Sequence, residues 1–249
     1  MAVGRKPLQG VMNIVRFNWH FYAIALLLML AGAIVAYYMQ LPVLLLLTGL
    51  AFTGCMLSLL VSMYIYDLSG LYELNWIAPA KGEKLVVNIH AGFDETSTLL
   101  QDKYPDAALQ IIDFYDPEKH TEISIKRARS LYPGLPQTIN AATHHLPLKD
   151  AAADKIFVIF SAHEIRDWEE RKLFMKELAR SLQSDGRIYI TEHLRDLPNF
   201  LAYNIGFFHF YPKRDWLKLF EDTGLKLERE NKLTPFISTF IIAKNDTAF

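Results

Sequence analysis

Residues 85–95 read LVVNIHAGFDE, and the rest of the fold can be worked out from this stretch. Its first half is apolar and rich in β-branched residues, as in a buried strand, and a glycine follows where a turn would lie. Acidic and hydroxyl residues then open a helix-like segment. In open α/β sheets, ligands bind beyond the carboxyl ends of the strands, so we expect a ligand site beside His90 and Gly92.

Strand-like and helix-like segments alternate downstream of this stretch. Alternation of this kind predicts a mostly parallel sheet with helices on both faces, closed by a late antiparallel hairpin. The α/β part is long enough for one sizeable core and too short for two. Strands are expected at 85–90, 108–113, 138–142, 155–160, 186–192, 226–233 and 236–244, and helices at 95–103, 122–131, 168–182 and 213–223.

Upstream of the strands, residues 17–66 contain no Asp, Glu, Lys or Arg. A helix needs roughly 20 apolar residues to cross a bilayer, so this run is long enough for two crossings. Pro42 suits the first turn of a helix, which divides the run into spans at about 17–39 and 43–66. This pattern excludes a plain soluble protein, and the run is too long for a cleaved signal peptide. Two buried helices of a soluble core are the alternative.

Charge along the chain predicts the orientation of this hairpin. Basic residues precede residue 17 and resume at Lys81, while the connecting turn has none, so both termini should face the cytoplasm. The first sixteen residues hold Arg5, Lys6 and Arg16 and no acidic residue, as in an interfacial helix on a lipid bilayer. The remaining 23 basic residues face 27 acidic ones, which argues against a nucleic-acid partner.

Four motifs of the α/β part occur in an informative order. They are the glycine-bearing loop NIHAGFD at 88–94, Asp113 at the end of the second strand, an LP segment with a later Asp before the fourth strand, and GRIYITE at 186–192. In this order they resemble the class I S-adenosylmethionine-dependent methyltransferases over residues 81–244. The resemblance implies a Rossmann-like seven-stranded methyltransferase sheet, mostly parallel with a C-terminal antiparallel hairpin, preceded by the two-helix transmembrane hairpin. The expected parts are a basic tail or interfacial helix (1–16), the hairpin (17–66), a connector (67–80) and the methyltransferase-like domain (81–249).

The same resemblance implies S-adenosylmethionine as cofactor. The family's first motif usually reads D/E-x-G-x-G-x-G, whereas this chain has Asn88 for the acid and His90 and Asp94 for two of the glycines. Asp113 follows at about the spacing at which a carboxylate accepts both ribose hydroxyls, with a turn-capping role as the alternative. The implied cofactor residues are Asn88, His90, Gly92, Asp113 and Ser161.

Methyl transfer needs alignment and, for a weak nucleophile, a general base. Histidine titrates near neutral pH, and a neighbouring carboxylate can raise its basicity. We therefore expect His163 or His193 as the base, with Glu164 and Glu192 orienting it or contacting substrate. Ordinary caps and surface ion pairs are the alternative. A zinc, iron or manganese site is another alternative for these side chains, although no HExxH spacing supports it and we predict none.

Residues 197–212 form a second uncharged segment, dominated by aromatic side chains. Such a segment after the fifth strand suits a lid over a hydrophobic acceptor or a face dipping into the bilayer. Packing against the connector near Trp76 is the alternative. We expect a cytoplasm-facing, membrane-anchored methyltransferase acting on a hydrophobic or lipid-phase acceptor; a scaffold or ligand-binding protein without turnover, or a metal-dependent enzyme, are the other hypotheses. The expected acceptor-binding residues are Arg166, Arg195, Tyr203 and Phe207.

Overall fold

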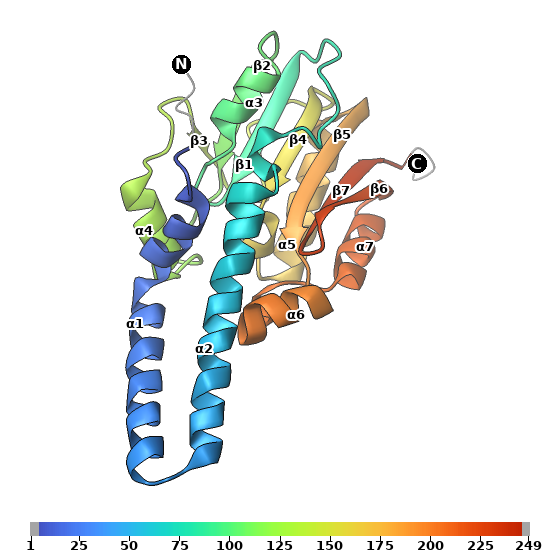
Figure 1. Ribbon diagram of the computed structural model, residues 1–249. Coiled ribbons are helices and arrows are strands. Elements are labelled where there is room, and N and C mark those ends of the chain that lie inside the picture. The colour runs from blue at the N-terminus through green and yellow to red at the C-terminus, as the bar shows by residue number, and fades with distance from the viewer. Residues whose placement is uncertain (1–4, 246–249) are drawn as a thin grey trace.

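The computed structural model describes residues 5–245, so the first four residues of the predicted tail and the last four of the predicted domain lie outside it. Two long helices, α1 (Gln9–Tyr38) and α2 (Pro42–Met63), form an antiparallel hairpin that projects from an α/β domain (Figure 1). Both are long and apolar enough to cross a membrane, and only 6% and 0% of their most apolar windows are buried. Helices this exposed do not form the core of a soluble domain, so the alternative of two buried core helices does not describe them.

The α/β domain contains a single seven-stranded sheet in the order β3-β2-β1-β4-β5-β7-β6. The first five strands run parallel, and β7 lies antiparallel between β5 and β6. The predicted fold class is therefore confirmed. The strands are β1 (Leu85–His90), β2 (Ala108–Asp113), β3 (Ile139–Asn140), β4 (Ala153–Ile159), β5 (Leu182–His193), β6 (Leu225–Thr234) and β7 (Ile237–Lys244).

Short helices connect the strands and cover both faces of the sheet (Figure 1). Side chains of β1 alternate between two cores, because successive residues of a strand point to opposite faces. Val87 and Ile89 pack in one core with α5 and α7, whereas Val86 packs in the other with α3 and the connector. The helices are α3 (Ser97–Lys103), α4 (Ile123–Leu131), α5 (Trp168–Ser181), α6 (Leu197–Tyr203) and α7 (Lys213–Asp222), with shorter turns η1 (Tyr64–Leu68), η2 (Leu71–Glu73), η3 (Ala162–Glu164) and η4 (Asn204–His209).

Two predicted strand boundaries are wrong. The third strand shrinks to two residues, because it pairs only with β2 at the edge of the sheet. β5 begins four residues before the predicted start, since Leu182 already pairs with Ala153 of β4. The predicted tail or interfacial helix corresponds, from Gln9 onward, to the first part of α1. A kink at Asn18 (φ −116°, ψ 18°) still marks the predicted boundary between tail and span.

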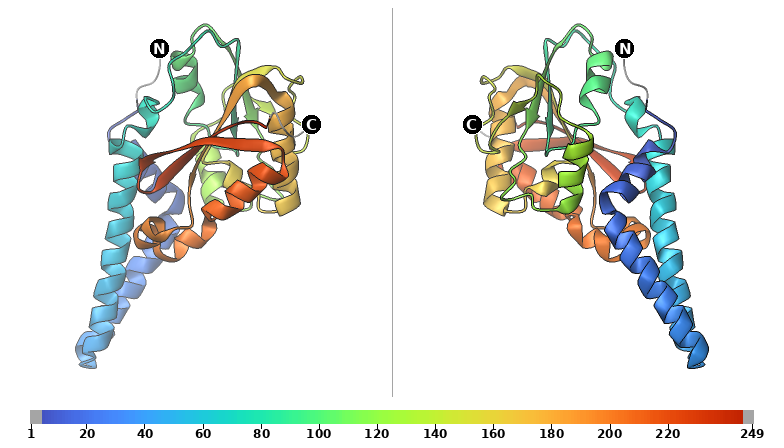
Figure 2. Two further views of the ribbon diagram at one scale, coloured as in Figure 1. Left: turned by 90° about the vertical axis from the view of Figure 1, so that its right-hand side faces the viewer. Right: turned by 90° about the vertical axis from the view of Figure 1, so that its left-hand side faces the viewer.

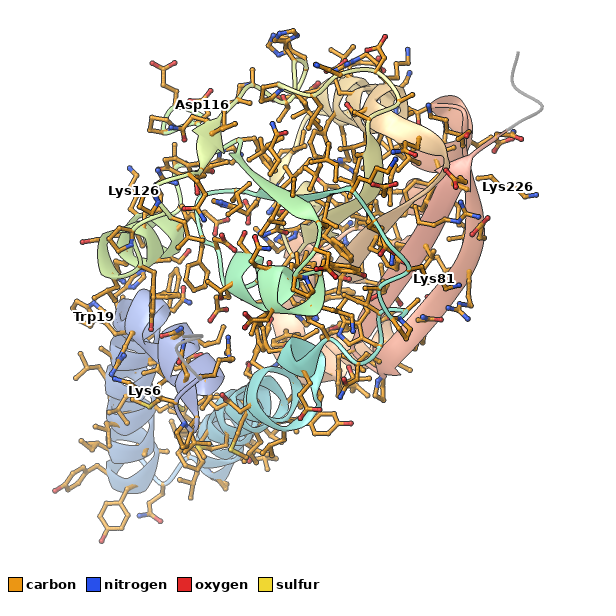
Figure 3. The ribbon with its side chains drawn as sticks, turned by 90° about the horizontal axis from the view of Figure 1, so that it is seen from above. Lys6, Trp19, Lys81, Asp116, Lys126 and Lys226 are labelled. Atoms are coloured by element: carbon orange, nitrogen blue, oxygen red, sulfur yellow. The ribbon has the colours of Figure 1, made fainter. Side chains whose placement is uncertain are left out.

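The kinked first part of α1 packs on the domain rather than extending away from it (Figure 2). Asp67 accepts hydrogen bonds from the main-chain N–H groups of Gly10 (2.7 Å) and Val11 (2.9 Å) at the open first turn of α1. Gly10 permits this approach, because a Cβ there would lie 2.4 Å from the Tyr66 Cβ. Seen from above, Trp19 lies on the hairpin next to α4 (Figure 3), and the Arg127 guanidinium lies 5.2 Å from its ring. The base of the hairpin is therefore built into the domain.

Candidate functional site

A cavity of about 700 Å³ lies between the hairpin and the carboxyl edge of the sheet. This acceptor cavity, as we call it, lies within the 300–1,000 Å³ range of small-molecule sites. One wall comes from α1, α2 and η1, and the other from the loops after β4 and β5 and from η4. Residues from both walls include Tyr22, Ser58 and Tyr66 of the hairpin and His163, His193 and Tyr203 of the domain.

His193, at the end of β5, presents a neutral ring nitrogen to this cavity. Its Nδ1 lies 3.0 Å from the Phe236 carbonyl oxygen, which can only accept, so Nδ1 carries the proton. Its Nε2 then accepts a hydrogen bond from the Tyr66 hydroxyl at 2.8 Å. Burial lowers the pKa of His193 to about 4, with the hydrogen bond from His193 to the Asn199 amide oxygen opposing that shift, so the ring is neutral at pH 7. Of the two predicted bases, His193 has the protonation state that the role requires.

His163, in η3 after β4, lies between two carboxylates. Its Nδ1 is 2.7 Å from Glu192 and its Nε2 is 3.2 Å from Glu164. Burial opposes the charged ring, but the two carboxylates outweigh it and raise the pKa of His163 to about 10. Hydrogen bonds from His163 and His209 hold the pKa of Glu164 well below its usual range, against the effect of burial. His163 is thus an imidazolium at neutral pH unless another cation takes the proton's place, and it is unsuited to accept a proton there.

The predicted cofactor residues meet at the ends of β1 and β2, where His90 and Asp113 are register partners. The Asp113 carboxylate accepts hydrogen bonds from the Tyr115 main chain (2.9 Å) and from the Arg129 guanidinium (2.5 Å). His90 Nε2 and Asp94 Oδ2 lie 4.0 Å apart, and within residues 5–245 neither has a hydrogen-bond partner. Burial lowers the pKa of His90 despite Asp94 and Asp113, so its ring tends to stay neutral.

The other two predicted cofactor residues are occupied with the fold. The Asn88 amide donates to Thr96 Oγ1 (3.0 Å) and Ser97 Oγ (2.8 Å), which ties β1 to the start of α3. The Ser161 hydroxyl donates to the Ile89 carbonyl at 3.0 Å and joins the ends of β4 and β1. Both side chains are almost completely buried. The hydrogen bonds of Asn88 and Ser161 thus hold together the loops around the site.

The space at this edge is narrower than a cofactor needs. The cavity lined by His90, Phe93, Thr96 and Glu164 measures about 110 Å³, below the usual range of small-molecule sites. Arg129 fills the neighbouring space: its Nη1 lies 2.9 Å from where a Gly92 Cβ would be, and Gly92 has a φ of +90°. The polar groups fit S-adenosylmethionine, since a carboxylate for the ribose and unpartnered buried donors and acceptors are in place. The Arg129 side chain, which is 36% exposed, occupies the Asp113 carboxylate and would have to leave it for the cofactor to bind.

The predicted acceptor-binding residues divide into two groups. Tyr203 lines the acceptor cavity, whereas Phe207 packs outside it on Phe200 and Phe208, with ring centroids 5.1 and 4.6 Å apart. Arg195 donates to the carbonyl oxygens of Phe208 and Phe210 and so holds η4 in place. Arg166 donates to the His209 carbonyl at 2.7 Å, and its guanidinium also lies against the His209 ring. Both guanidinium groups thus already contact η4.

Sequence reasoning did not single out Tyr66, Arg129, Phe160 and His209 as site residues. Phe160 directly follows β4 with a φ of +51°. It lines both the acceptor cavity and the cavity of about 110 Å³ beside His90, which we call the cofactor crevice. Its ring stacks on His193 at 5.2 Å. His209 had a signal in the sequence, as the only titratable histidine or acid within the uncharged segment 197–212. Tyr66 and Arg129 had none, because their roles arise from the packing of distant segments.

Comparison with known proteins agrees with this geometry. Residues 115–190 match the family model described as a methyltransferase domain. A crystal structure of a SAM dependent methyltransferase from Aquifex aeolicus is 17% identical with a TM-score of 0.51, covering 72% of this chain and 94% of that one. The PH0226 protein from Pyrococcus horikoshii OT3 is 16% identical with a TM-score of 0.54, covering 73% and 91%. The search of curated proteins gives no match. At these identities the solved structures establish the fold.

Proposed function

We propose that this chain, whose α/β domain is a class I S-adenosylmethionine-dependent methyltransferase, is anchored in a membrane and methylates a hydrophobic acceptor delivered from the lipid phase. The observation that carries the proposal is the acceptor cavity, because the apolar hairpin itself forms one of its walls. A hydrophobic molecule moving along the hairpin would reach the predicted catalytic histidines without crossing water. Confinement to the bilayer also raises the effective concentration of a lipidic acceptor at the site.

A second apolar surface supports membrane contact. α6 packs against α2 where the hairpin leaves the domain (Figure 1). On α6 and η4, Leu197, Ile205 and Phe208 are 67%, 83% and 61% exposed. Exposed apolar side chains gathered beside an exposed apolar hairpin are typical of a surface that inserts into the head-group region. The predicted orientation, with both termini and the domain in the cytoplasm, is part of this proposal.

The chain's own residues supply alignment and a proton acceptor. S-adenosylmethionine supplies a methyl group on a sulfonium, and Asp113 with the main chain around Gly92 would hold it. An acceptor hydroxyl in the cavity passes its proton to the Tyr66 oxygen while Tyr66 passes its own proton to His193 Nε2. The Nδ1–H bond to the Phe236 carbonyl keeps the ring in the required tautomer. Phe160, between crevice and cavity, would set the approach of the two reactants.

The test uses the full chain in lipid nanodiscs with methyl-labelled S-adenosylmethionine and a lipid extract as acceptor source. We expect label in the lipid fraction, and loss of both cofactor binding and labelling in Asp113→Ala. Asp222→Ala is the matched control, since Asp222 is an exposed carboxylate at the end of α7, before the edge strand β6 at the other end of the sheet. Cofactor binding without labelling of any lipid fraction would count against a lipid-phase acceptor, and unchanged cofactor binding in Asp113→Ala would overturn the cofactor assignment.

A ligand-binding protein without turnover is the second candidate. The closed crevice of about 110 Å³ and the Arg129 contact with Asp113 favour it. Calorimetry with S-adenosylmethionine distinguishes the two candidates. A ligand-binding protein of this second kind would bind no S-adenosylmethionine, either as the native chain or as Arg129→Ala.

A further inference from the structure

Three ligand-type side chains converge on the domain side of the acceptor cavity. His163 and Glu164 belong to η3 and His209 ends η4, two segments that are far apart in the sequence. One donor atom from each lies within 4.8 Å of the others. Glu164 Oε1 is 3.2 Å from His163 Nε2 and 3.7 Å from His209 Nε2. An atom placed between these three donors would also face the cavity, because His163 and His209 both line it.

The opposite ring nitrogens of both histidines face further carboxylates. His163 Nδ1 lies 2.7 Å from Glu192, and His209 Nδ1 lies 3.5 Å from Glu122. Metal-binding histidines usually donate their second N–H to a carboxylate or carbonyl, which fixes the tautomer and makes the ligating nitrogen more basic. The cluster therefore has inner donors directed at one point and outer carboxylates that orient them.

We propose that His163, Glu164 and His209 bind a divalent zinc ion whose open coordination position faces the acceptor cavity. Two imidazole nitrogens and one carboxylate oxygen form a donor set of catalytic zinc sites, in which a fourth position is left for water or substrate. Magnesium and calcium prefer all-oxygen sites and fit this cluster less well. At the open position the ion binds an oxygen of the acceptor's head group and aligns it; this role rests on the proposed function.

The charges around the cluster suit a cation. Three carboxylates, those of Glu122, Glu164 and Glu192, surround the two rings. Arg166 is the competing cation, because its Nη2 lies 2.6 Å from His209 Nδ1 and 2.5 Å from His209 Nε2, the nitrogen directed at the ion. Zinc binding requires this exposed guanidinium to withdraw from the ring.

The test measures zinc in the full chain in nanodiscs after equilibration with zinc and dialysis, with methyl transfer assayed in the same samples. We expect about one zinc per chain, and at least a hundredfold weaker binding in His209→Ala and Glu164→Gln. His209 is 31% exposed, so its removal should leave the fold intact. Arg166→Ala should bind more tightly by about tenfold, and His144→Ala, which removes an exposed histidine elsewhere, should match the native chain.

Glu192 is a positioning residue, and its role has its own readout. Loss of such a partner weakens metal binding by about 10–100-fold, so Glu192→Gln should show that loss and Glu192→Asp should recover part of it. The metal-free Glu192→Gln chain should also melt at a lower temperature, because the buried His163 ring loses its carboxylate partner, so zinc is measured below that temperature. Equal zinc in the native chain and His209→Ala, or none in either, would overturn the site even where methyl transfer persists. Stoichiometric zinc in a chain without methyl transfer would support the site and refute the proposed function instead.

Discussion

Replacing Arg129 with alanine should make S-adenosylmethionine bind more tightly. In the structure the Arg129 guanidinium donates to Asp113 at 2.5 Å and lies 4.3 Å from the Tyr115 ring, across the space beside Gly92. The cofactor's ribose hydroxyls need the same carboxylate. Every cofactor molecule that binds must therefore first separate Arg129 from Asp113, and the alanine variant removes this competition.

The size of the effect follows from the contact. A hydrogen bond to a charged group contributes about 1.5–3 kcal/mol, and solvent screening reduces this for a guanidinium that is 36% exposed. We take a net preference of about 1.4 kcal/mol for the closed arrangement, which leaves roughly one chain in ten with Asp113 free. Because apparent affinity scales with the binding-competent fraction, Arg129→Ala should lower the apparent Kd about tenfold.

Calorimetry on the full chain in nanodiscs measures this directly. The matched control is Lys126→Ala, which removes the same charge from the exposed side of the same helix (Figure 3) and should leave the Kd unchanged. Asp113→Ala should bind weakly whether or not Arg129 is present. Weaker binding in Arg129→Ala would refute the reasoning, because it would mean that Arg129 contacts the cofactor rather than competes with it.

Three further outcomes are expected. Tyr66→Phe should slow methyl transfer roughly 100-fold with cofactor affinity unchanged, as measured by initial rates and calorimetry; equal loss of both would indicate a packing defect. The melting temperature without added metal should depend on pH in two ranges. The low pKa of His193 (about 4) should lower it as pH falls from about 6.5 to 4. The high pKa of His163 (about 10) should lower it as pH rises from about 6.5 to 10. His193→Gln should abolish only the acid effect and His163→Gln only the alkaline one; both effects persisting in either variant would contradict these assignments. Gly10→Ala should destabilise the full chain by about 1–3 kcal/mol through overpacking against Tyr66, whereas Gly49→Ala, with open space around it, should not; equal melting temperatures would count against the tight contact.

The sequence was sufficient for the order of elements and for the sheet. Strong signals such as the buried runs at β1 and β2 gave boundaries that match the structure. β3 was overestimated, because only two of residues 138–142 find a partner on β2. Strand pairing at a sheet edge is decided by the neighbouring strand, which local composition does not describe.

The sequence predicts which loops form the site, but it does not predict how their side chains pair. His193 and His163 both follow central strands and both lie next to a carboxylate in sequence, yet one ring is neutral and the other protonated at pH 7. The difference arises because Glu192 turns toward His163 across the strands, leaving its chain neighbour His193 to Tyr66 and the Phe236 carbonyl. Which carboxylate faces which ring depends on strand register and side-chain direction, and adjacency in sequence suggested the wrong pairing for Glu192.

The hairpin has a larger part than that of a tether. A tether would touch the domain only through its linker. Here Arg5, just before α1, pairs with Glu95 at 2.8 Å, and the Phe17 ring of α1 lies 5.3 Å from Phe93. Phe93 and Glu95 both line the cofactor crevice. At its other end the hairpin supplies Tyr66 to His193. The same helices thus contact the crevice, complete the proton acceptor and wall the acceptor cavity. In the proposed membrane-anchored arrangement, a displacement of the hairpin would therefore change cofactor access and acceptor access together, through contacts that a flexible linker does not provide.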